Sequence, residues 1–222
     1  HVIIDGIDFK PAYTNDIKKR VGYMSQRFTL YNDLSVVENL DFAAALRGVA
    51  REIYLTRREV LLDFIGWNRN LKTVVNDLPG GVKQEVALCV ALLHDPSIVF
   101  LDEPTAGVAP HARMRFWKLI RKLAQSGKTI FVSTHYMDEA ENCSRIALMR
   151  AGELIAIDSP ESLKRKTFGD TLYSLRASRK NPSMPLPDVV DIWQPYGANF
   201  HLRFRDGVRV ASHLKRLQRD WE

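Results

Sequence analysis

Two adjacent acidic residues, Asp102 and Glu103, close an apolar stretch of the chain. Four of the six residues in Ser97–Asp102 are apolar, which predicts a strand covered on both faces, as in the parallel sheet of an α/β protein. Open α/β sheets bind their ligands at the carboxyl ends of the strands. We therefore expect both carboxylates to lie at a ligand-binding edge.

A pair of glycines, Gly80 and Gly81, precedes this strand and opens a predicted helix. The first turn of a helix has backbone N–H groups without intrahelical partners and carries the positive end of the helix dipole, so it can bind an anion such as phosphate. A structural cap and a solvated acidic turn would explain either feature alone. The combination at this separation favours a ligand site.

Two further polar residues stand at the ends of predicted strands. Gln26 ends the predicted strand Val21–Gln26, and His135 follows the predicted strand Thr129–Thr134. A lone histidine is more often structural, and a glutamine at a strand end is unremarkable by itself. Their position relative to the other motifs is what makes them candidate site residues.

Helix-start patterns mark three further elements. A capping-box pattern opens the predicted helix Ser35–Arg47, and a second capping box is predicted to start a helix at Thr56–Glu59. A proline suits the first position of the predicted helix Pro110–Gln125. These helices would position the loops that carry the candidate residues.

The stretches Leu78–Gln84 and Val99–Thr105 resemble, respectively, the signature loop and the Walker B segment of ABC-type ATPases. The resemblance extends from about Asp5 to Lys166 and is closest to the ATP-binding subunits of ABC-2-type exporters. It implies an α/β, P-loop NTPase-like ABC ATPase domain over residues 1–166, with a mainly parallel sheet and a helical subdomain at about 27–94. Residues 167–222 would form a small C-terminal α+β extension.

The resemblance implies a role for each candidate residue at the strand ends. Asp102 would support Mg²⁺, and Glu103 would act as general base towards the attacking water. Gln26 is then the Q-loop glutamine, which reaches Mg²⁺ and that water, and His135 is the H-loop histidine, which contacts the γ-phosphate. ATP and Mg²⁺ are thus the expected ligands, and ATP hydrolysis is the expected activity.

Two partners are implied in the same way. Pro79, Gly80 and Gly81 would cap ATP held by a second ABC ATPase domain, in a homodimer, a heterodimer or a tandem chain. An ABC-2-type membrane permease would use the released energy for export, which places the chain in the cytoplasm, peripheral on the inner face of the cell membrane. No nucleic-acid partner is expected.

Four positions depart from the family pattern. Pro79 replaces the signature serine, Val82 replaces a polar residue, Glu85 stands where the exporters usually carry arginine, and Ala109 replaces the D-loop aspartate. The first change removes a hydroxyl and an N–H that could contact phosphate. An asymmetric dimer would explain these departures. The alternatives are a degenerate, non-hydrolysing interaction module and, with less support, a soluble ribosome-associated ABC protein.

A phosphate-binding P-loop, G-x-x-x-x-G-K-[ST], is expected before the predicted hairpin His1–Phe9, and the printed sequence holds none there. Gly127-Lys128-Thr129 is a false match, because Lys122 occupies the position of the first glycine and a strand follows rather than a helix. We expect a piece of a larger protein that is truncated at the N-terminus, lacks the Walker A segment and is inactive alone.

Composition is that of an ordinary globular protein, with 45% hydrophobic and 26% charged residues. The longest apolar run, Val86–Leu93, is far shorter than a membrane span. Cys89 and Cys143 form no metal or redox motif and are expected at buried helical positions. The net charge of +6 comes from residues 163–222, which hold 12 basic and 6 acidic side chains. A solvated basic face explains this excess.

The pattern changes after Thr167, where we expect a different small unit. Its predicted elements are a strand at Thr171–Ala177, a loop at Lys180–Pro187, strands at Val189–Gln194 and Asn199–Phe204, and a basic amphipathic helix at Val208–Gln218. These segments carry no motif with a chemical role.

Overall fold

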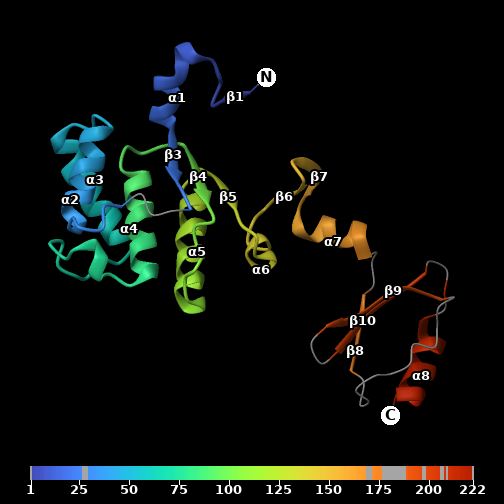
Figure 1. Cartoon of the computed structure of the whole chain (residues 1–222). Helices are drawn as coiled ribbons and strands as arrows, with labels where there is room; N and C mark the ends of the chain where they lie inside the picture. The colour runs from blue at the N-terminus through green and yellow to red at the C-terminus, as the bar shows by residue number, and fades with distance from the viewer. Residues whose placement is uncertain are drawn as a thin grey trace. The chain divides into compact units, whose positions relative to one another are not determined.

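A three-stranded parallel sheet lies at the centre of the first part of the chain (Figure 1). Its strands are β3 (Val21–Met24), β4 (Ile98–Asp102) and β5 (Thr129–Ser133), in the order β3-β4-β5. The pairing aligns their carboxyl ends, because Met24 lies opposite Leu101 and Leu101 opposite Val132. The predicted parallel α/β sheet is thus confirmed, and β4 and β5 are neighbours in it, with β4 in the centre and β5 at one side of the three described strands.

The computed structural model describes residues 2–26, 30–168, 172–176, 189–196, 199–205, 208 and 210–221. The chain divides into two compact units, His1–Glu139 and Ala140–Glu222. This division reflects packing, and the boundary expected between residues 166 and 167 stays a prediction.

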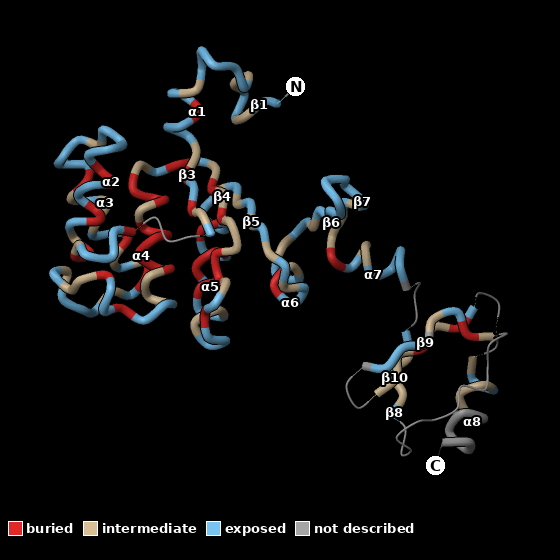
Figure 2. The backbone as a smooth tube through the Cα atoms, viewed as in Figure 1, coloured by how far each residue is buried: buried red, intermediate tan, exposed pale blue. Residues whose placement is uncertain are grey.

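The helices α4 (Gly80–Leu92) and α5 (Pro110–Gln125) pack beside the sheet and are rich in buried residues. Helix α4 packs on β3 and α5 on β5, and buried residues concentrate in these elements (Figure 2). A Cβ added to Gly22 of β3 would lie 2.5 Å from the carbonyl oxygen of Ala91 in α4, so only glycine permits this approach. The helix predicted from Pro110 to Gln125 is confirmed at both ends.

The sequence predicts that β4 is covered on both faces, but the face turned away from the buried side is only partly covered. Val99 and Leu101 are fully buried, but Phe100 is only partly buried. It lies in one register row with Tyr23 and Phe131, which are 50% and 54% exposed. The burial of β4 therefore alternates along the strand, because only one of its faces packs on the helices of this unit.

The expected helical subdomain contains α2 (Val36–Leu46) and α3 (Arg51–Phe64) beside α4. The capping box at α2 is confirmed, because the Glu38 carboxylate accepts the Ser35 N–H at 2.7 Å and the Ser35 hydroxyl accepts the Glu38 N–H. The hydrogen bonds from Ser35 hold the pKa of Glu38 below its ordinary value. The second predicted capping box is wrong. Thr56 lies inside α3 and donates its hydroxyl to the carbonyl of Glu52, one turn back.

The chain begins with the predicted hairpin of β1 (Ile3–Ile4) and β2 (Ile7–Asp8). Its two turn residues, Asp5 and Gly6, have φ values of 50° and 78°, which a two-residue type I′ turn requires. The short helices η1 (Pro11–Tyr13) and α1 (Thr14–Arg20) connect the hairpin to β3.

The second unit contains the antiparallel pair β6 (Ile146–Arg150) and β7 (Glu153–Asp158), followed by α7 (Pro160–Phe168). Further along, β8 (Tyr173–Arg176), β9 (Val190–Tyr196) and β10 (Asn199–Phe204) form an antiparallel sheet in the order β8-β10-β9, and α8 (Val210–Trp221) follows. Val190, Leu202 and Phe204 form the hydrophobic core beside this sheet. The predicted loop Lys180–Pro187 lies outside the described residues.

The two cysteines occupy different environments. Cys89 is buried in α4, and burial raises the pKa of its thiol. Cys143 is half-buried and follows the four-residue helix α6 (Met137–Ala140), so its expected helical position is wrong. In the described part of the chain, no helix has the length and apolar character that a membrane crossing needs.

Candidate functional site

Three candidate residues meet at the carboxyl edge of the parallel sheet. The amide nitrogen of Gln26, just beyond β3, donates to Glu103 Oε2 at 2.9 Å. Nδ1 of His135, just beyond β5, lies 3.3 Å from the same oxygen. These candidate residues therefore lie together, and Glu103, directly after the central strand β4, is the residue that contacts the other two.

The backbone of Glu103 is held in an uncommon conformation. Its φ is 43°, in the left-handed region, where a residue with a Cβ is strained by about 1–2 kcal/mol. Its N–H donates to both the carbonyl and the hydroxyl of Ser133 in β5, at 3.1 and 3.0 Å. These bonds offset the strain and fix where the Glu103 side chain leaves the strand.

Ser133 also orients the neighbouring carboxylate. Its hydroxyl donates to Asp102 Oδ1 at 2.5 Å. Ser133 was not among the candidate residues predicted from the sequence, although its place at the carboxyl end of a predicted strand, near His135, was a usable signal. One serine thus links the two acidic residues to the strand that precedes His135.

Asp102 and Gln26 offer oxygen donors of the kind that Mg²⁺ prefers. This cation takes one or two protein ligands and completes its octahedron with water and phosphate oxygens. Within the described ranges, no group of three or more histidine, cysteine or acidic residues could hold a metal by itself. The donor set fits a cation shared with a phosphate-bearing ligand.

The Gly-Gly loop opens α4 as predicted. Pro79 is the N-cap, with φ −58° and ψ 147°, and it provides no side-chain cap. Its carbonyl accepts the N–H groups of Val82 and Lys83 at 2.9 and 3.0 Å. Pro79 and Gly80 are exposed, whereas Gly81 packs towards α5. The described contacts of this loop lead to α5, and none of them joins it to Glu103.

Gly81→Ala is expected to destabilise the fold, because its Cβ would lie 2.7 Å from the Cβ of Ala112 in α5. Overpacking of this kind costs about 1–3 kcal/mol. Gly80→Ala is the matched control, because nothing lies within 4 Å of its added Cβ. Urea unfolding should show a lower midpoint for Gly81→Ala and an equal or higher one for Gly80→Ala. Equal midpoints for the two variants would contradict the close α4–α5 approach.

The segment that follows Gln26 is tied to the segment that leads into the Gly-Gly loop. Backbone bonds join Val36 N to Thr73 O at 3.0 Å and Val75 N to Leu34 O at 2.9 Å. Asn39 of α2 is 3% exposed and locks this arrangement. Its side chain accepts the Tyr31 N–H at 2.8 Å and donates to the carbonyls of Tyr31 and Ser35, each at 3.0 Å.

Helix α4 also carries a buried charge. Glu85 is 5% exposed, and its Oε1 lies 2.8 Å from Nε of Arg115 in α5. Arg115 donates in addition to the carbonyl of Ile65 at the end of α3, at 2.6 Å. Burial raises the pKa of Glu85, and the charge of Arg115 partly opposes this. The pair connects three helices.

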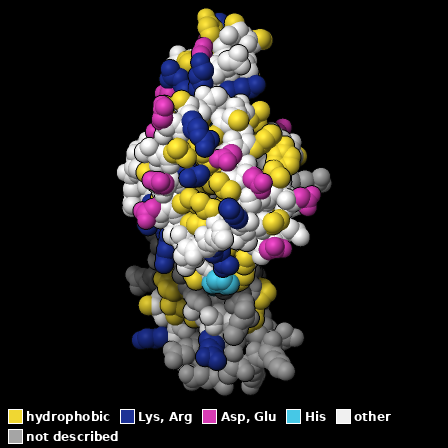
Figure 3. Space-filling model, turned by 90° about the vertical axis from the view of Figure 1, so that its left-hand side faces the viewer, with side chains coloured by type: hydrophobic (Ala, Val, Ile, Leu, Met, Phe, Trp, Pro, Cys, Tyr) yellow, Lys and Arg dark blue, Asp and Glu magenta, His cyan; other side chains and the backbone are white. Residues whose placement is uncertain are grey.

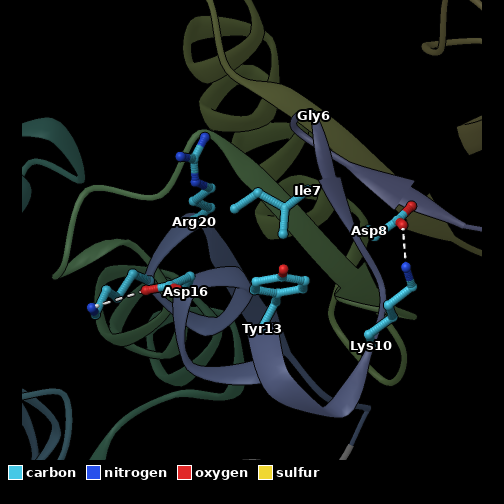
Figure 4. A pocket seen from close by; sticks show the side chains of 8 residues that line it. Gly6, Ile7, Asp8, Lys10, Tyr13, Asp16 and Arg20 are labelled. Carbon is cyan, nitrogen blue, oxygen red and sulfur yellow. Dashed lines mark hydrogen bonds and ion pairs between the residues drawn. The ribbon is translucent and has the colours of Figure 1, made fainter.

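A hollow of about 630 Å³ lies elsewhere, between the first hairpin and α1. Ile7 and Tyr13 lie together in it, and an Asp8–Lys10 ion pair of 2.7 Å stands at one side (Figure 4). Its wall includes Arg20, which precedes β3, so it adjoins the amino end of that strand. Gln26 follows the opposite end, and the hollow is therefore separate from the Glu103 cluster.

Exposed apolar side chains mark the helical part of the first unit. Phe42 and Leu46 of α2 and Ile53 and Val60 of α3 are 44–74% exposed. Figure 3 views the molecule from the side of these helices and shows hydrophobic side chains between basic and acidic ones. Single apolar side chains among charged ones are common on protein surfaces and do not by themselves mark a binding site.

The chain resembles known proteins over much of its length. Residues 1–106 match the family model described as ABC transporter. Over 168 residues, the chain is 38% identical to the probable multidrug ABC transporter ATP-binding protein YbhF of Escherichia coli. The chain contains an ABC transporter ATP-binding domain. The match covers 76% of this chain and 29% of that relative.

Two further proteins resemble this ABC ATPase domain. The linearmycin resistance ATP-binding protein LnrL of Bacillus subtilis is 31% identical over 169 residues, which cover 76% of this chain and 54% of the relative. A solved dimeric ATP-binding cassette in a post-hydrolysis state, bound to ADP and Pi, superimposes with a TM-score of 0.60 at 26% identity. The superposition covers 70% of this chain and 71% of the other. The chain thus spans about a third of the length of YbhF and about half of the length of LnrL.

Proposed function

We propose that this chain belongs to the ATP-hydrolysing subunit of an ABC-type exporter and couples ATP hydrolysis to transport through a partner permease. The observation that carries the proposal is the gathering of Gln26 and His135 on one oxygen of Glu103. A carboxylate in that place can accept a proton from a water molecule that attacks the γ-phosphate.

Each residue of the cluster would have its own role in ATP hydrolysis. Glu103 is the general base, and Gln26 orients it and the attacking water. Asp102 and the amide oxygen of Gln26 would hold Mg²⁺, which neutralises phosphate charge when bound. His135, whose ring stands beside Glu103 and is 57% exposed, would reach the γ-phosphate. Pro79, Gly80 and Gly81 would meet the nucleotide of a second ATPase domain.

The partners follow from the same proposal. An ABC-2-type permease would bind the exposed apolar side chains of α2 and α3, and the chain would act on the inner face of the cell membrane. The names of the relatives, a probable multidrug transporter subunit and a linearmycin resistance protein, support export. The permease would select the exported compound.

The deciding experiment measures Mg²⁺-dependent ATP turnover by the intact protein that carries this chain, with and without its permease. We expect turnover that the permease stimulates. A second candidate is a non-hydrolysing half that binds a catalytic ATPase, which the replacements at Pro79 and Ala109 favour. Stable binding of a second ATPase domain without turnover at this domain's own site would select that candidate.

Pro79→Ser is expected to strengthen dimer closure. The exposed loop would regain a hydroxyl and an N–H at the start of α4, and each hydrogen bond to a charged phosphate contributes about 1.5–3 kcal/mol. The ATP-bound dimer should therefore live longer, and the turnover at the partner's site should change. Pro11→Ser, a change at the start of the distant helix η1, is the control. If Pro79→Ser leaves the partner's site unaltered, this loop does not cap nucleotide.

A further inference from the structure

A buried carboxylate, Glu139, lies behind the sheet edge and is 2% exposed. Its two oxygens are held by two threonines from different loops. Thr105 donates its hydroxyl to Oε1 at 2.5 Å, and Thr134 donates to Oε2 at 2.8 Å. A buried carboxylate that receives directed bonds on both oxygens is fixed in place.

These two threonines adjoin the residues of the proposed reaction. Thr105 lies two positions after Glu103, in the turn that follows β4, and is 1% exposed. Thr134 directly precedes His135, at the end of β5. Glu139 therefore joins the two loops whose side chains meet at Glu103 Oε2.

A cation from α5 completes the arrangement. Nε of Arg113 lies 3.3 Å from Glu139 Oε1, and its guanidinium stands 4.1 Å over the ring of Tyr136. The Tyr136 N–H donates to the Thr134 hydroxyl at 3.1 Å, and its ring lies 4.1 Å from that of His135, centre to centre. The side chain of His135 is thereby backed by groups that Glu139 organises.

We propose that Glu139 is a positioning residue, which sets the distance between Glu103 and His135 by bridging Thr105 and Thr134. The inference rests on the proposed ATP hydrolysis for its kinetic consequence, but its structural part concerns the chain alone. Glu139 touches neither substrate nor water in this role. It acts through the two hydroxyls.

The first test reads the geometry without nucleotide. In the chain of residues 1–222, the ring nitrogen and carbon NMR resonances of His135 report on its contact with Glu103, and Glu103→Gln supplies the reference for an altered contact. In Glu139→Gln the His135 resonances should move towards that reference. Asp138→Asn, which removes an exposed carboxylate from the same short helix, should leave them in place. Unmoved resonances in Glu139→Gln would overturn the proposal.

The second test separates positioning from a loss of stability. In the intact ATPase, Glu139→Gln should lower kcat about 10–100-fold, because small displacements of reacting groups have effects of this size, with KM for ATP within about twofold. Thr134→Val, which keeps the side-chain shape, should also lower kcat and leave KM nearly unchanged. Thr129→Val, at the exposed start of β5, should leave kcat unchanged. A rise in KM with unchanged kcat would overturn the proposal.

The two tests also distinguish this inference from the proposed function. If the unaltered intact protein shows no turnover, the exporter ATPase proposal fails, and the NMR comparison still decides the role of Glu139. If Glu139→Gln does not fold, the Thr105→Val and Thr134→Val variants each remove a single bond to Glu139 and take its place in both measurements.

Discussion

Glu103→Gln in the intact protein is expected to lower ATP turnover by about 10²–10⁴-fold, the usual effect of losing a positioned general base. Glutamine keeps the size of the side chain and can still interact with Gln26 and His135. The change therefore removes basicity with little change of shape. ATP binding should persist, and the ATP-bound dimer should live longer.

Single-turnover hydrolysis and nucleotide binding, measured on the same preparation, check this expectation. Glu153→Gln is a suitable control, because it neutralises an exposed carboxylate in β7. Unchanged hydrolysis in Glu103→Gln would remove the assignment of Glu103 as base. A parallel loss of ATP binding would instead show that Glu103 serves to bind nucleotide.

Arg115→Met is expected to destabilise the first unit, because it leaves Glu85 buried without its counter-charge. Breaking a buried ion pair costs about 3–5 kcal/mol, and the lower end applies here since 54% of the Arg115 side chain is exposed. The carbonyl of Ile65 also loses a donor. Chemical denaturation at pH 7.5 should show the loss, whereas Lys118→Met, one turn along α5 and exposed, should change stability little.

The loss of stability in Arg115→Met should also depend on pH. The pKa of Glu85 in the fold lies above its ordinary value of 4.5, mainly because of burial, so the folded state binds this proton more tightly than the unfolded state. Its contribution to stability is therefore most favourable at low pH and declines as pH rises through the raised pKa. Arg115→Met removes a charge that lowers this pKa, so the deficit of the variant should shrink as pH falls from 7.5 towards 5.

A double variant isolates the pair itself. Glu85→Leu with Arg115→Met replaces both charges by apolar groups of similar size, and such replacements are often neutral or stabilising. Recovery of most of the stability would show that the isolated carboxylate causes the loss. A double variant as unstable as Arg115→Met would show that the bond to the Ile65 carbonyl matters more.

Local sequence patterns determined the elements of this fold. The apolar run of Ser97–Asp102 encodes a strand, Ser35 and Glu38 cap a helix, and Pro110 starts one, because each pattern acts over a few residues. The same locality explains the error at Thr56–Glu59. A capping pattern within a longer helix cannot by itself reveal that the helix has already begun at Arg51.

The motif residues of the candidate site could also be found in the sequence, since Gln26, Asp102, Glu103 and His135 each stand at the end of a recognisable strand or just beyond it. The contacts between these residues could not be predicted from the sequence. Gln26 and Glu103 are 77 positions apart, and their meeting depends on the order and register of β3, β4 and β5. Long-range pairing is a property of the packed sheet.

Tertiary structure alone decided which charged residues are buried. Glu139 stands in an acidic stretch beside the exposed Asp138, and Glu85 occupies a helix whose other members are mostly apolar. Nothing in their neighbours along the chain distinguishes a buried carboxylate from a solvated one. The distinction arises because Thr105, Thr134, Arg113 and Arg115 approach them from other loops and from α5, and a carboxylate is tolerated inside a protein only where such partners meet it.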